Sequence, residues 1–195
     1  ETITPAGQEI IRLQKKAVLQ MKQTNNALND ILKLRQGLLS KEAIVSDPRP
    51  LGQIIAAVKD TLQQDLEKAG AQININLNGL EQVPFPFVYM QSMFYNLLVN
   101  AIKFRHADRP PVIDITAVRL NENNFRFTVA DNGLGFDILR NKNKLFGIFK
   151  RFHPQIEGTG VGLHIVKSIA EAFSGEVTVT SEPGKGTEFV VVLSN

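Results

Sequence analysis

The sequence predicts an α+β fold, in which helices lie against a mixed, mostly antiparallel sheet. Segments with the period of an amphipathic helix and segments with the alternating period of a strand follow one another in mixed order. Two pairs of predicted strands are also joined by short polar turns, as in hairpins, over residues 112–130 and 176–193. A doubly wound parallel sheet would need each strand to be followed by a helix, so we do not expect one.

The composition excludes several classes of protein. The 195 residues suit one domain with an appendage, and 43% hydrophobic residues can bury a core. A net charge of +3, from 22 basic and 19 acidic side chains, is too balanced to indicate binding to nucleic acid or to an acidic membrane. No apolar run is long enough to span a bilayer and no secretory signal is present, so we expect no membrane contact within these residues.

Cysteine is absent, which excludes disulfides and fits a cytoplasmic location. The chain begins at Glu1 without a methionine. We therefore interpret it as an excised part of a longer protein, and a membrane anchor elsewhere in that protein stays an open alternative.

Residues 6–40 are predicted to form one long amphipathic helix, because apolar or small residues recur every seven positions along a polar segment. Such a stripe on a helix that precedes a domain is typical of packing against other helices, so we predict a helical dimerisation segment over 1–45 and a homodimer. A hairpin turn over 22–26, or a helix packed only on its own domain, are the alternatives. The seven-residue series is Ile10, Ala17, Thr24, Ile31 and Leu38.

Residues 46–195 are predicted to form the second domain. Two prolines mark 46–50 as a linker, Gly70 is suited to end a helix, and two further prolines restrict 83–87 to an edge strand or a turn. A polar segment that becomes aromatic, over 137–158, is predicted to be a lid. The expected elements are helix 51–68, strand 72–77, helix 87–104, strands 112–120 and 124–130, helix 159–173, and strands 176–180 and 187–193.

Two glycine clusters bracket the predicted lid: DNGLGFD begins at Asp131 and EGTGVGL ends at Leu163. Glycine-rich turns that open a helix can bind phosphate, because free N–H groups and the helix dipole point at the ligand. The P-loop motif is absent, and no G-x-G-x-x-G follows a strand, which removes two common classes of nucleotide-binding protein. The histidines are scattered along the chain, and we expect structural or solvent roles for His106, His153 and His164.

Asn96, Asn100 and Lys103 fall on one face of the helix predicted over 87–104. An asparagine oxygen is a suitable ligand for Mg²⁺, and a lysine one turn away can meet a phosphate. Asp131 lies at a strand end before two glycines, where its carboxylate can accept from an exocyclic amine such as that of adenine. Surface polar residues and an ordinary turn aspartate are the alternatives. We expect Asn100 and Asp131 at opposite ends of one cleft.

Five motifs in order resemble the ATP-binding domain of sensor histidine kinases, in the superfamily shared with Hsp90, DNA gyrase and MutL. The resemblance covers residues 47–193, and the lid is similar to that of phytochrome-type kinases. It implies a Bergerat-type ATP-binding fold, a two-layer α/β sandwich with helices on one face of the sheet, preceded by a long helix. The motifs are NLLVNAIKF (96–104), DNGLGF (131–136), LFGIFKRF (145–152), EGTGVGL (157–163) and GKGTEF (184–189).

The resemblance implies a role for each matching residue. Asn100 would coordinate Mg²⁺ between the ATP phosphates beside Asn96, and Lys103 would contact phosphate. Phe104 would lie against adenine, and Asp131 would hold its amino group with Thr187 helping through water. The other implied ATP contacts are Gly133 and Gly135 around the base, Gly158, Thr159, Gly160, Val161, Gly162 and Leu163 at the phosphates, and Lys150 and Arg151 from the lid.

Asn96 decides between two reactions within this superfamily. Relatives that hydrolyse ATP carry a glutamate there as general base, which asparagine cannot replace. The resemblance therefore favours phosphoryl transfer to a histidine and relay to the receiver domain of a response regulator. A non-catalytic ATP-sensing module and an ATPase are the alternatives. In this family the acceptor histidine lies on the first helix of a dimerising hairpin, and here no histidine precedes His106. The resemblance therefore implies that 6–40 is the second helix of that hairpin, with the first helix cut off or never present.

Three positions depart from the pattern of this family. His164 replaces a residue that is usually small, and Ser174 replaces a frequent glycine. The segment VPFPF, at 83–87, lacks an aspartate that the family often has nearby. None of the three lies in a predicted nucleotide contact.

Overall fold

The computed structural model describes residues 49–141, 145–150, 156 and 158–195, together with six isolated helical positions within the first 32 residues. The predicted helix over 6–40, its alternative turn at 22–26 and most of the linker lie outside the described residues. Within the described part, no helix is both long and apolar enough to cross a membrane.

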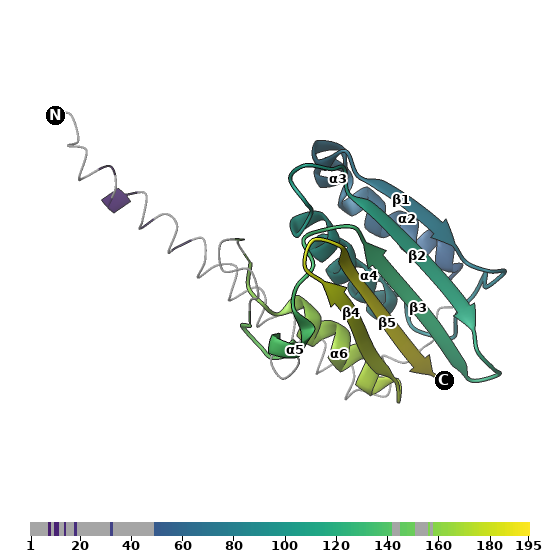
Figure 1. Ribbon diagram of the computed structural model, residues 1–195. Helices are drawn as coiled ribbons and strands as arrows, with labels where there is room; N and C mark the ends of the chain where they lie inside the picture. The colour runs from purple at the N-terminus through teal and green to yellow at the C-terminus, as the bar shows by residue number, and fades with distance from the viewer. Residues whose placement is uncertain are drawn as a thin grey trace.

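Five strands form one sheet in the order β1-β2-β3-β5-β4 (Figure 1). The first pair is parallel and the other three pairs are antiparallel. The prediction of a mixed, mostly antiparallel sheet is therefore confirmed. The strands are β1 (Gln72–Asn76), β2 (Val112–Arg119), β3 (Asn124–Asp131), β4 (Glu176–Glu182) and β5 (Gly186–Ser194).

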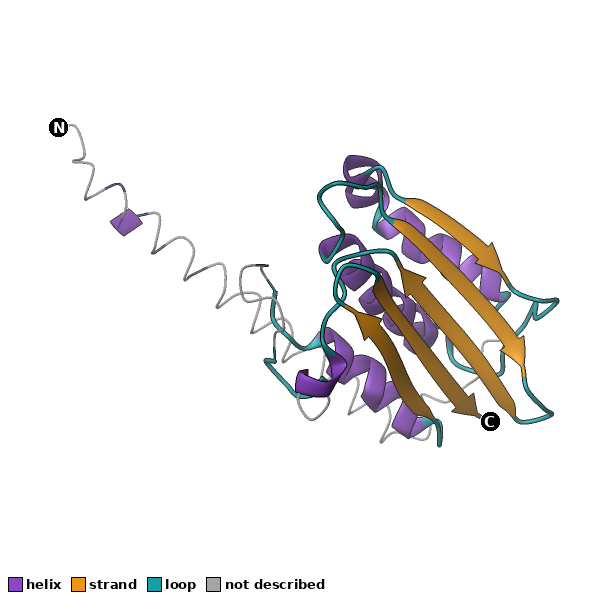
Figure 2. Cartoon of the chain, viewed as in Figure 1, coloured by secondary structure: helices purple, strands orange, loops and turns teal. Residues whose placement is uncertain are grey.

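The longer helices that the structure describes all cover the same face of this sheet, and none of the described elements covers the other, bare face (Figure 2). The alternating burial along β2 and β3 reflects this arrangement, because inward side chains are buried and outward ones are not. The helices are α2 (Leu51–Thr61), α3 (Gln63–Ala69), α4 (Phe87–Lys103), the single turn α5 (Ile138–Asn141) and α6 (Gly162–Ala172).

The predicted helix over 51–68 is wrong in one respect, because it is two helices. Leu62 has φ −100° and ψ 7°, which ends α2 and begins α3. Its side chain is only 3% exposed, so burial in the core accompanies the break. Gly70 follows α3 in the left-handed conformation at φ 62°, as predicted for its cap.

The segment 83–87 forms no strand. Its neighbour Gln82 makes an isolated bridge to Pro50, and Val83 and Phe85 are buried in the core. Prolines 84 and 86 cannot donate to a ladder, which explains why the chain turns here and enters α4 directly.

Helix α6 begins at Gly162, three residues later than predicted, because 158–161 form a loop. Its other end is closed by Ser174 in the left-handed conformation at φ 47°. The Gly175 N–H then donates to the Ala170 carbonyl at 2.8 Å. A Cβ at Gly175 would lie 1.9 Å from the Val192 carbonyl oxygen, so this turn packs tightly against β5.

The core lies between the sheet and α4. Phe85 packs edge-on against Phe125 and Phe173, with ring centroids 5.4 and 5.2 Å apart. Phe94 of α4 packs in the same manner on Phe127 of β3 at 6.1 Å. These contacts fix one side of α4 to the sheet, so its polar side is directed away from the core.

Candidate functional site

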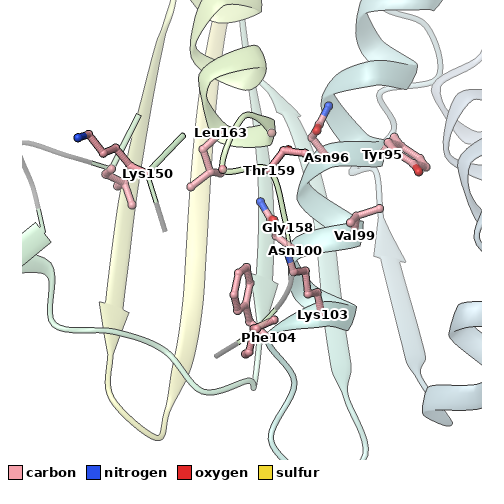
Figure 3. Close-up of a pocket in the computed structure, with 14 residues that line it drawn as sticks. Tyr95, Asn96, Val99, Asn100, Lys103, Phe104, Lys150, Gly158, Thr159 and Leu163 are labelled. Carbon is pink, nitrogen blue, oxygen red and sulfur yellow. The ribbon is translucent and has the colours of Figure 1, made fainter. Parts of the chain in front are cut away.

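The polar side of α4 lines a cleft of about 360 Å³ between α4, α6 and the lid (Figure 3). Asn96, Asn100 and Lys103 all lie on this wall, each partly exposed, as their spacing predicted. The residues that line the cleft are Tyr95, Asn96, Val99, Asn100, Lys103, Phe104, Leu145, Lys150, Ile156, Gly158, Thr159, Gly160, Gly162 and Leu163.

A smaller and mainly apolar pocket of about 40 Å³ adjoins the cleft. Asn100, Phe104 and Leu163 line both cavities, so the two are adjacent. Asn100 and Asp131 both line the smaller pocket, so they belong to one site. Asp131 does not line the larger cleft, and we therefore call its end of the site the inner end. The residues of the smaller pocket are Asn100, Phe104, Asp131, Gly135, Phe136, Leu163, Thr187 and Phe189.

Asp131 is the last residue of β3, opposite Thr187 of β5. Burial raises the pKa of its carboxyl above the usual 3.8, and hydrogen bonds from the backbone of Gly133 and Thr187 act in the opposite direction. The Gly133 N–H donates to Oδ1 at 2.8 Å. The structure therefore holds this carboxylate in one orientation against the apolar pocket.

A chain of hydroxyl groups orients Thr187. Ser181 Oγ donates to the Gly186 carbonyl at 2.9 Å and accepts from the Phe136 N–H at 2.9 Å. Its contact with Thr187 Oγ1, also 2.9 Å, must then use the hydrogen of the threonine. The Thr187 hydroxyl can therefore still accept a hydrogen bond from a water or a ligand in the pocket, but its own hydrogen is already donated to Ser181.

The glycines before and at the start of α6 lie close to polar side chains of α4. A Cβ at Gly162 would lie 2.7 Å from Asn96 Oδ1, and one at Gly158 would lie 1.8 Å from Lys103 Nζ. The amide of Asn96 is held from the other side, since Nδ2 donates to the Ser92 carbonyl at 2.8 Å. The start of α6 therefore closes directly over the polar residues of α4.

The lid enters the site through Lys150, which lines the cleft (Figure 3). Its position depends on α6, because His164 Nδ1 lies 3.2 Å from the Phe146 carbonyl and Lys167 Nζ lies 6.0 Å from the Phe146 ring centroid. A carbonyl only accepts, so Nδ1 of His164 carries the hydrogen. The structural role expected for His164 is confirmed, whereas Arg151 lies outside the described residues.

Not every predicted residue faces the cavity. Val161 is 1% exposed and belongs to the hydrophobic core. Gly133 supports the pocket from outside it, since its Cβ position is 2.4 Å from the Phe104 carbonyl oxygen. Gly135 has φ 57° and lies against the Glu182 carbonyl, so its conformation and its packing both favour glycine.

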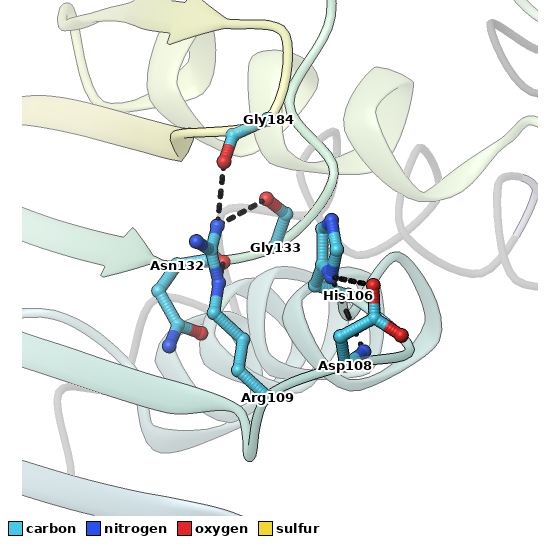
Figure 4. A network of polar contacts seen from close by, with 6 residues as sticks. All are labelled: His106, Asp108, Arg109, Asn132, Gly133 and Gly184. Carbon is cyan, nitrogen blue, oxygen red and sulfur yellow. Dashed lines mark hydrogen bonds and ion pairs between the residues drawn. The ribbon is translucent and has the colours of Figure 1, made fainter.

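Sequence reasoning missed the arginine that ties this region together. Arg109 donates to the carbonyls of Asn132, Gly133 and Gly184, beside a contact between His106 and Asp108 (Figure 4). The only sequence signal is its place before two prolines, which identifies a loop and nothing more.

The arrangement suits a ligand with a flat ring at one end and an anion at the other. The inner pocket offers apolar walls and one carboxylate, and the cleft offers lysines, amides and the N-terminal turn of a helix. Among the described residues, no three His, Cys, Asp or Glu side chains form a group that could hold a metal ion. A divalent cation would therefore need oxygens from the ligand in addition to an asparagine.

Comparison with known proteins supports this description. Residues 88–195 match the family model described as histidine kinase-, DNA gyrase B- and HSP90-like ATPase. Cyanobacterial phytochrome A of Nostoc sp. is 40% identical over 134 residues, which is 68% of this chain and 17% of that protein. Methanogenesis regulatory histidine kinase FilI of Methanothrix harundinacea is 34% identical over 175 residues, 88% of this chain and 18% of that protein. The chain thus spans about a fifth of these relatives.

Among solved structures, full-length ShkA in complex with AMPPNP superposes with a TM-score of 0.69 at 22% identity. The match covers 99% of this chain and 40% of ShkA. At this level of identity the similarity shows a shared fold.

Proposed function

The chain belongs to the family of histidine kinase-, DNA gyrase B- and HSP90-like ATPases, and on this premise we propose that it binds ATP with Mg²⁺ and transfers the γ-phosphoryl group to a histidine. The observation that carries the proposal is the adjacency of the two cavities: a pocket with apolar walls and one carboxylate lies beside a cleft lined by amides and lysines. The crystal structure of full-length ShkA, which shares the fold, is a complex with AMPPNP, and this supports a nucleotide as the ligand.

At the inner end, adenine would fill the apolar pocket between Phe104 and Leu163. Asp131 would accept a hydrogen bond from the exocyclic amine, in the orientation that the Gly133 N–H imposes on its carboxylate. Thr187 would accept a hydrogen bond from a bridging water, because its own hydrogen is used by Ser181.

At the outer end, the triphosphate would lie between Lys103 and the loop that opens α6. The N-terminal turn of α6 contributes N–H groups and a positive dipole, and Lys150 adds charge from the lid. The residues present fit Mg²⁺, since one amide oxygen from Asn100, two or more phosphate oxygens and water make a set that this ion accepts. When bound, Mg²⁺ would neutralise charge on the phosphates.

The chemistry favours transfer over hydrolysis because Asn96 cannot remove a proton from water. A neutral imidazole needs no such base: its unprotonated nitrogen forms the N–P bond with the γ-phosphorus while the bond to the bridging oxygen breaks and ADP leaves. The proton on the other ring nitrogen passes to solvent. The two histidines that the structure describes, His106 and His164, both have hydrogen-bond partners within the domain, whereas His153 lies outside the described residues. We expect the acceptor on a separate helical segment.

The relatives that carry a histidine kinase name suggest the wider setting. We propose that residues 1–45 take part in a homodimer, that the phosphoryl group passes to the receiver domain of a response regulator, and that these steps occur in the cytoplasm.

The first test is calorimetric titration with ATP in the presence and absence of Mg²⁺. We expect binding that Mg²⁺ strengthens, and we expect Asn100→Ala to lose most of that Mg²⁺ dependence while Asn74→Ala, which removes a hydrogen bond to Asp114 on the bare face of the sheet, keeps it. A flat titration of the unaltered chain would reject the proposal.

The second test addresses transfer. A longer protein that includes the preceding helix is incubated with γ-labelled ATP, and we expect label that is stable in base and lost in acid, as for a phosphohistidine. Binding without any such label would favour a non-catalytic ATP-sensing module, and steady phosphate release would favour an ATPase.

A further inference from the structure

Arg109 connects the two loops that close the inner end of the site (Figure 4). Its Nε donates to the Asn132 carbonyl at 2.8 Å, and its Nη2 donates to the carbonyls of Gly133 at 3.3 Å and Gly184 at 2.7 Å. We propose that Arg109 is a positioning residue for recognition of the base, acting through these carbonyls on the carboxylate of Asp131. The inference rests on the proposed nucleotide function.

Gly133 is the link between Arg109 and Asp131. Its carbonyl accepts from the arginine, while its N–H donates to Asp131 Oδ1 at 2.8 Å. The Asn132 carbonyl and the Gly133 N–H belong to one planar peptide unit, so the bond from Arg109 Nε to that carbonyl at 2.8 Å also fixes the direction of the N–H. Arg109 therefore controls the direction in which the carboxylate points, although it lies outside both cavities.

The turn between β4 and β5 is also bonded by Arg109. Gly184 lies in the turn between β4 and β5, where its carbonyl accepts from Arg109 and its N–H donates to the Leu134 carbonyl at 2.7 Å. Leu134 in turn donates its N–H to the Phe104 carbonyl at 2.8 Å. The loop after β3 is thus held between the end of α4 and the β4–β5 turn, and Arg109 bonds to the loop and to the turn.

Neighbouring contacts hold Arg109 itself. The Asp108 N–H donates to His106 Nδ1 at 3.2 Å, which shapes the turn before the arginine. After it, Asn132 Nδ2 donates to the Pro110 carbonyl at 3.1 Å and Asn132 Oδ1 accepts from the Val112 N–H at 2.9 Å. The backbone after Arg109 is therefore fixed to the loop that its side chain bonds, and the backbone before it is held by a local turn.

The geometry requires arginine rather than any cation. The planar guanidinium presents Nε and Nη donors in a rigid fork, which suits carbonyls on two different loops. A lysine in the same place keeps the charge but has a single nitrogen at the end of a flexible stem, so it cannot reach Asn132 and Gly184 together. Arg109→Lys is therefore the informative variant, because it removes the fork and leaves the charge.

A matched control exists at the far end of the same hairpin. Arg119 donates from Nε to the Asn121 carbonyl at 3.1 Å and from Nη2 to the Glu122 carbonyl at 2.8 Å. It makes the same kind of bond to a turn, and it lies in neither cavity. Arg119→Lys thus shows how the loss of an arginine with two carbonyl acceptors changes nucleotide affinity when that arginine lies far from the inner pocket.

The experiment compares ATP with purine riboside triphosphate, which has the same sugar and phosphates but lacks the 6-amino group. Affinities are measured by calorimetry with Mg²⁺ for the unaltered chain, Arg109→Lys and Arg119→Lys. We expect Arg109→Lys to lower the preference for ATP by about tenfold, since the oriented carboxylate contributes one charge-assisted hydrogen bond, and we expect Arg119→Lys to leave it unchanged. An unchanged preference in Arg109→Lys overturns the inference.

A second measurement does not depend on binding. Amide hydrogen exchange at Leu134 and Gly184 reports the two loops in the unliganded chain, and thermal unfolding reports overall stability. In Arg109→Lys we expect these two amides to exchange faster than in the unaltered chain, while exchange in strands β2 and β3 stays the same. If both amides exchanged at the same rate in Arg109→Lys and in the unaltered chain, the inference would be contradicted. If the unaltered chain bound no nucleotide while these amides behaved as expected, the proposed function and not the positioning of the loops would be rejected.

Discussion

Asp131 and Thr187 are direct partners in the register of β3 and β5, and the backbone of Thr187 hydrogen-bonds the aspartate carboxylate at the floor of the inner pocket. Partial burial of a carboxylate beside apolar walls costs free energy, and the backbone hydrogen bonds from Gly133 and Thr187 offset part of that cost. In the proposed complex with ATP, Asp131 is therefore the side chain that would recognise the base.

We predict that Asp131→Asn lowers the affinity for ATP by about ten- to a hundredfold, because the acceptor for the amino group is replaced by an amide that has donors of its own. Calorimetry with Mg²⁺ and ATP measures this loss. Asp114→Asn is the control, since that carboxylate bonds Asn74 on the bare face of the sheet. Equal affinity in both variants would argue against adenine in the inner pocket.

The same carboxyl predicts a dependence of stability on pH. Burial raises the pKa of Asp131 in the folded chain above 3.8, so between these two values the folded chain holds a proton that the unfolded chain has lost. The free energy of unfolding should therefore fall as the pH rises from about 4 through the raised pKa. Denaturant unfolding of the unaltered chain and of Asp131→Asn across this range isolates the effect, and an identical pH dependence in both would contradict it.

A methyl group at Gly162 should damage the outer end of the site. Its Cβ would lie 2.7 Å from Asn96 Oδ1, so the start of α6 or the amide must move. We predict that Gly162→Ala weakens ATP binding about tenfold or more, as expected for displacement of a phosphate-binding helix start. Gly52→Ala is a matched control in α2, where the nearest atom to a new Cβ is 4.0 Å away, and it should leave binding intact.

Ser174 offers a route to a more stable chain. It closes α6 at φ 47°, a conformation that glycine adopts without steric cost. Ser174→Gly should therefore raise the free energy of unfolding by about 1 kcal/mol, as measured by denaturant titration. The same change inside α4, Ser92→Gly, should lower it by a similar amount, and a loss of stability at both positions would show that the left-handed turn is not strained.

Much of the architecture follows from local patterns. The hairpins, the left-handed Gly70 and the shared face of Asn96, Asn100 and Lys103 depend on spacing along the chain, and the structure confirms each as a structural feature. Their predicted roles toward ATP and Mg²⁺ stay predictions. The position of Asp131 at the end of a strand was also predictable, because two glycines follow it.

Other features depend on contacts between distant segments. The break at Leu62 occurs without proline or glycine, and it reflects burial against the rest of the core. The late start of α6 follows from the close approach of Gly162 to α4. Arg109 could not be assigned from the sequence, because its three acceptors lie 23, 24 and 75 positions away.

The helix that carries Asn96, Asn100 and Lys103 is also the crossover between β1 and β2, the parallel pair in which Gln72 meets Val112. Parallel pairing across so long a connection is among the slower events in folding, because the connecting segment must be ordered before the pair is gained. The cleft is therefore complete only after β1 has paired with β2, and the proposed nucleotide would bind only chains in which this pair has formed. Binding would then stabilise the last tertiary contacts to form.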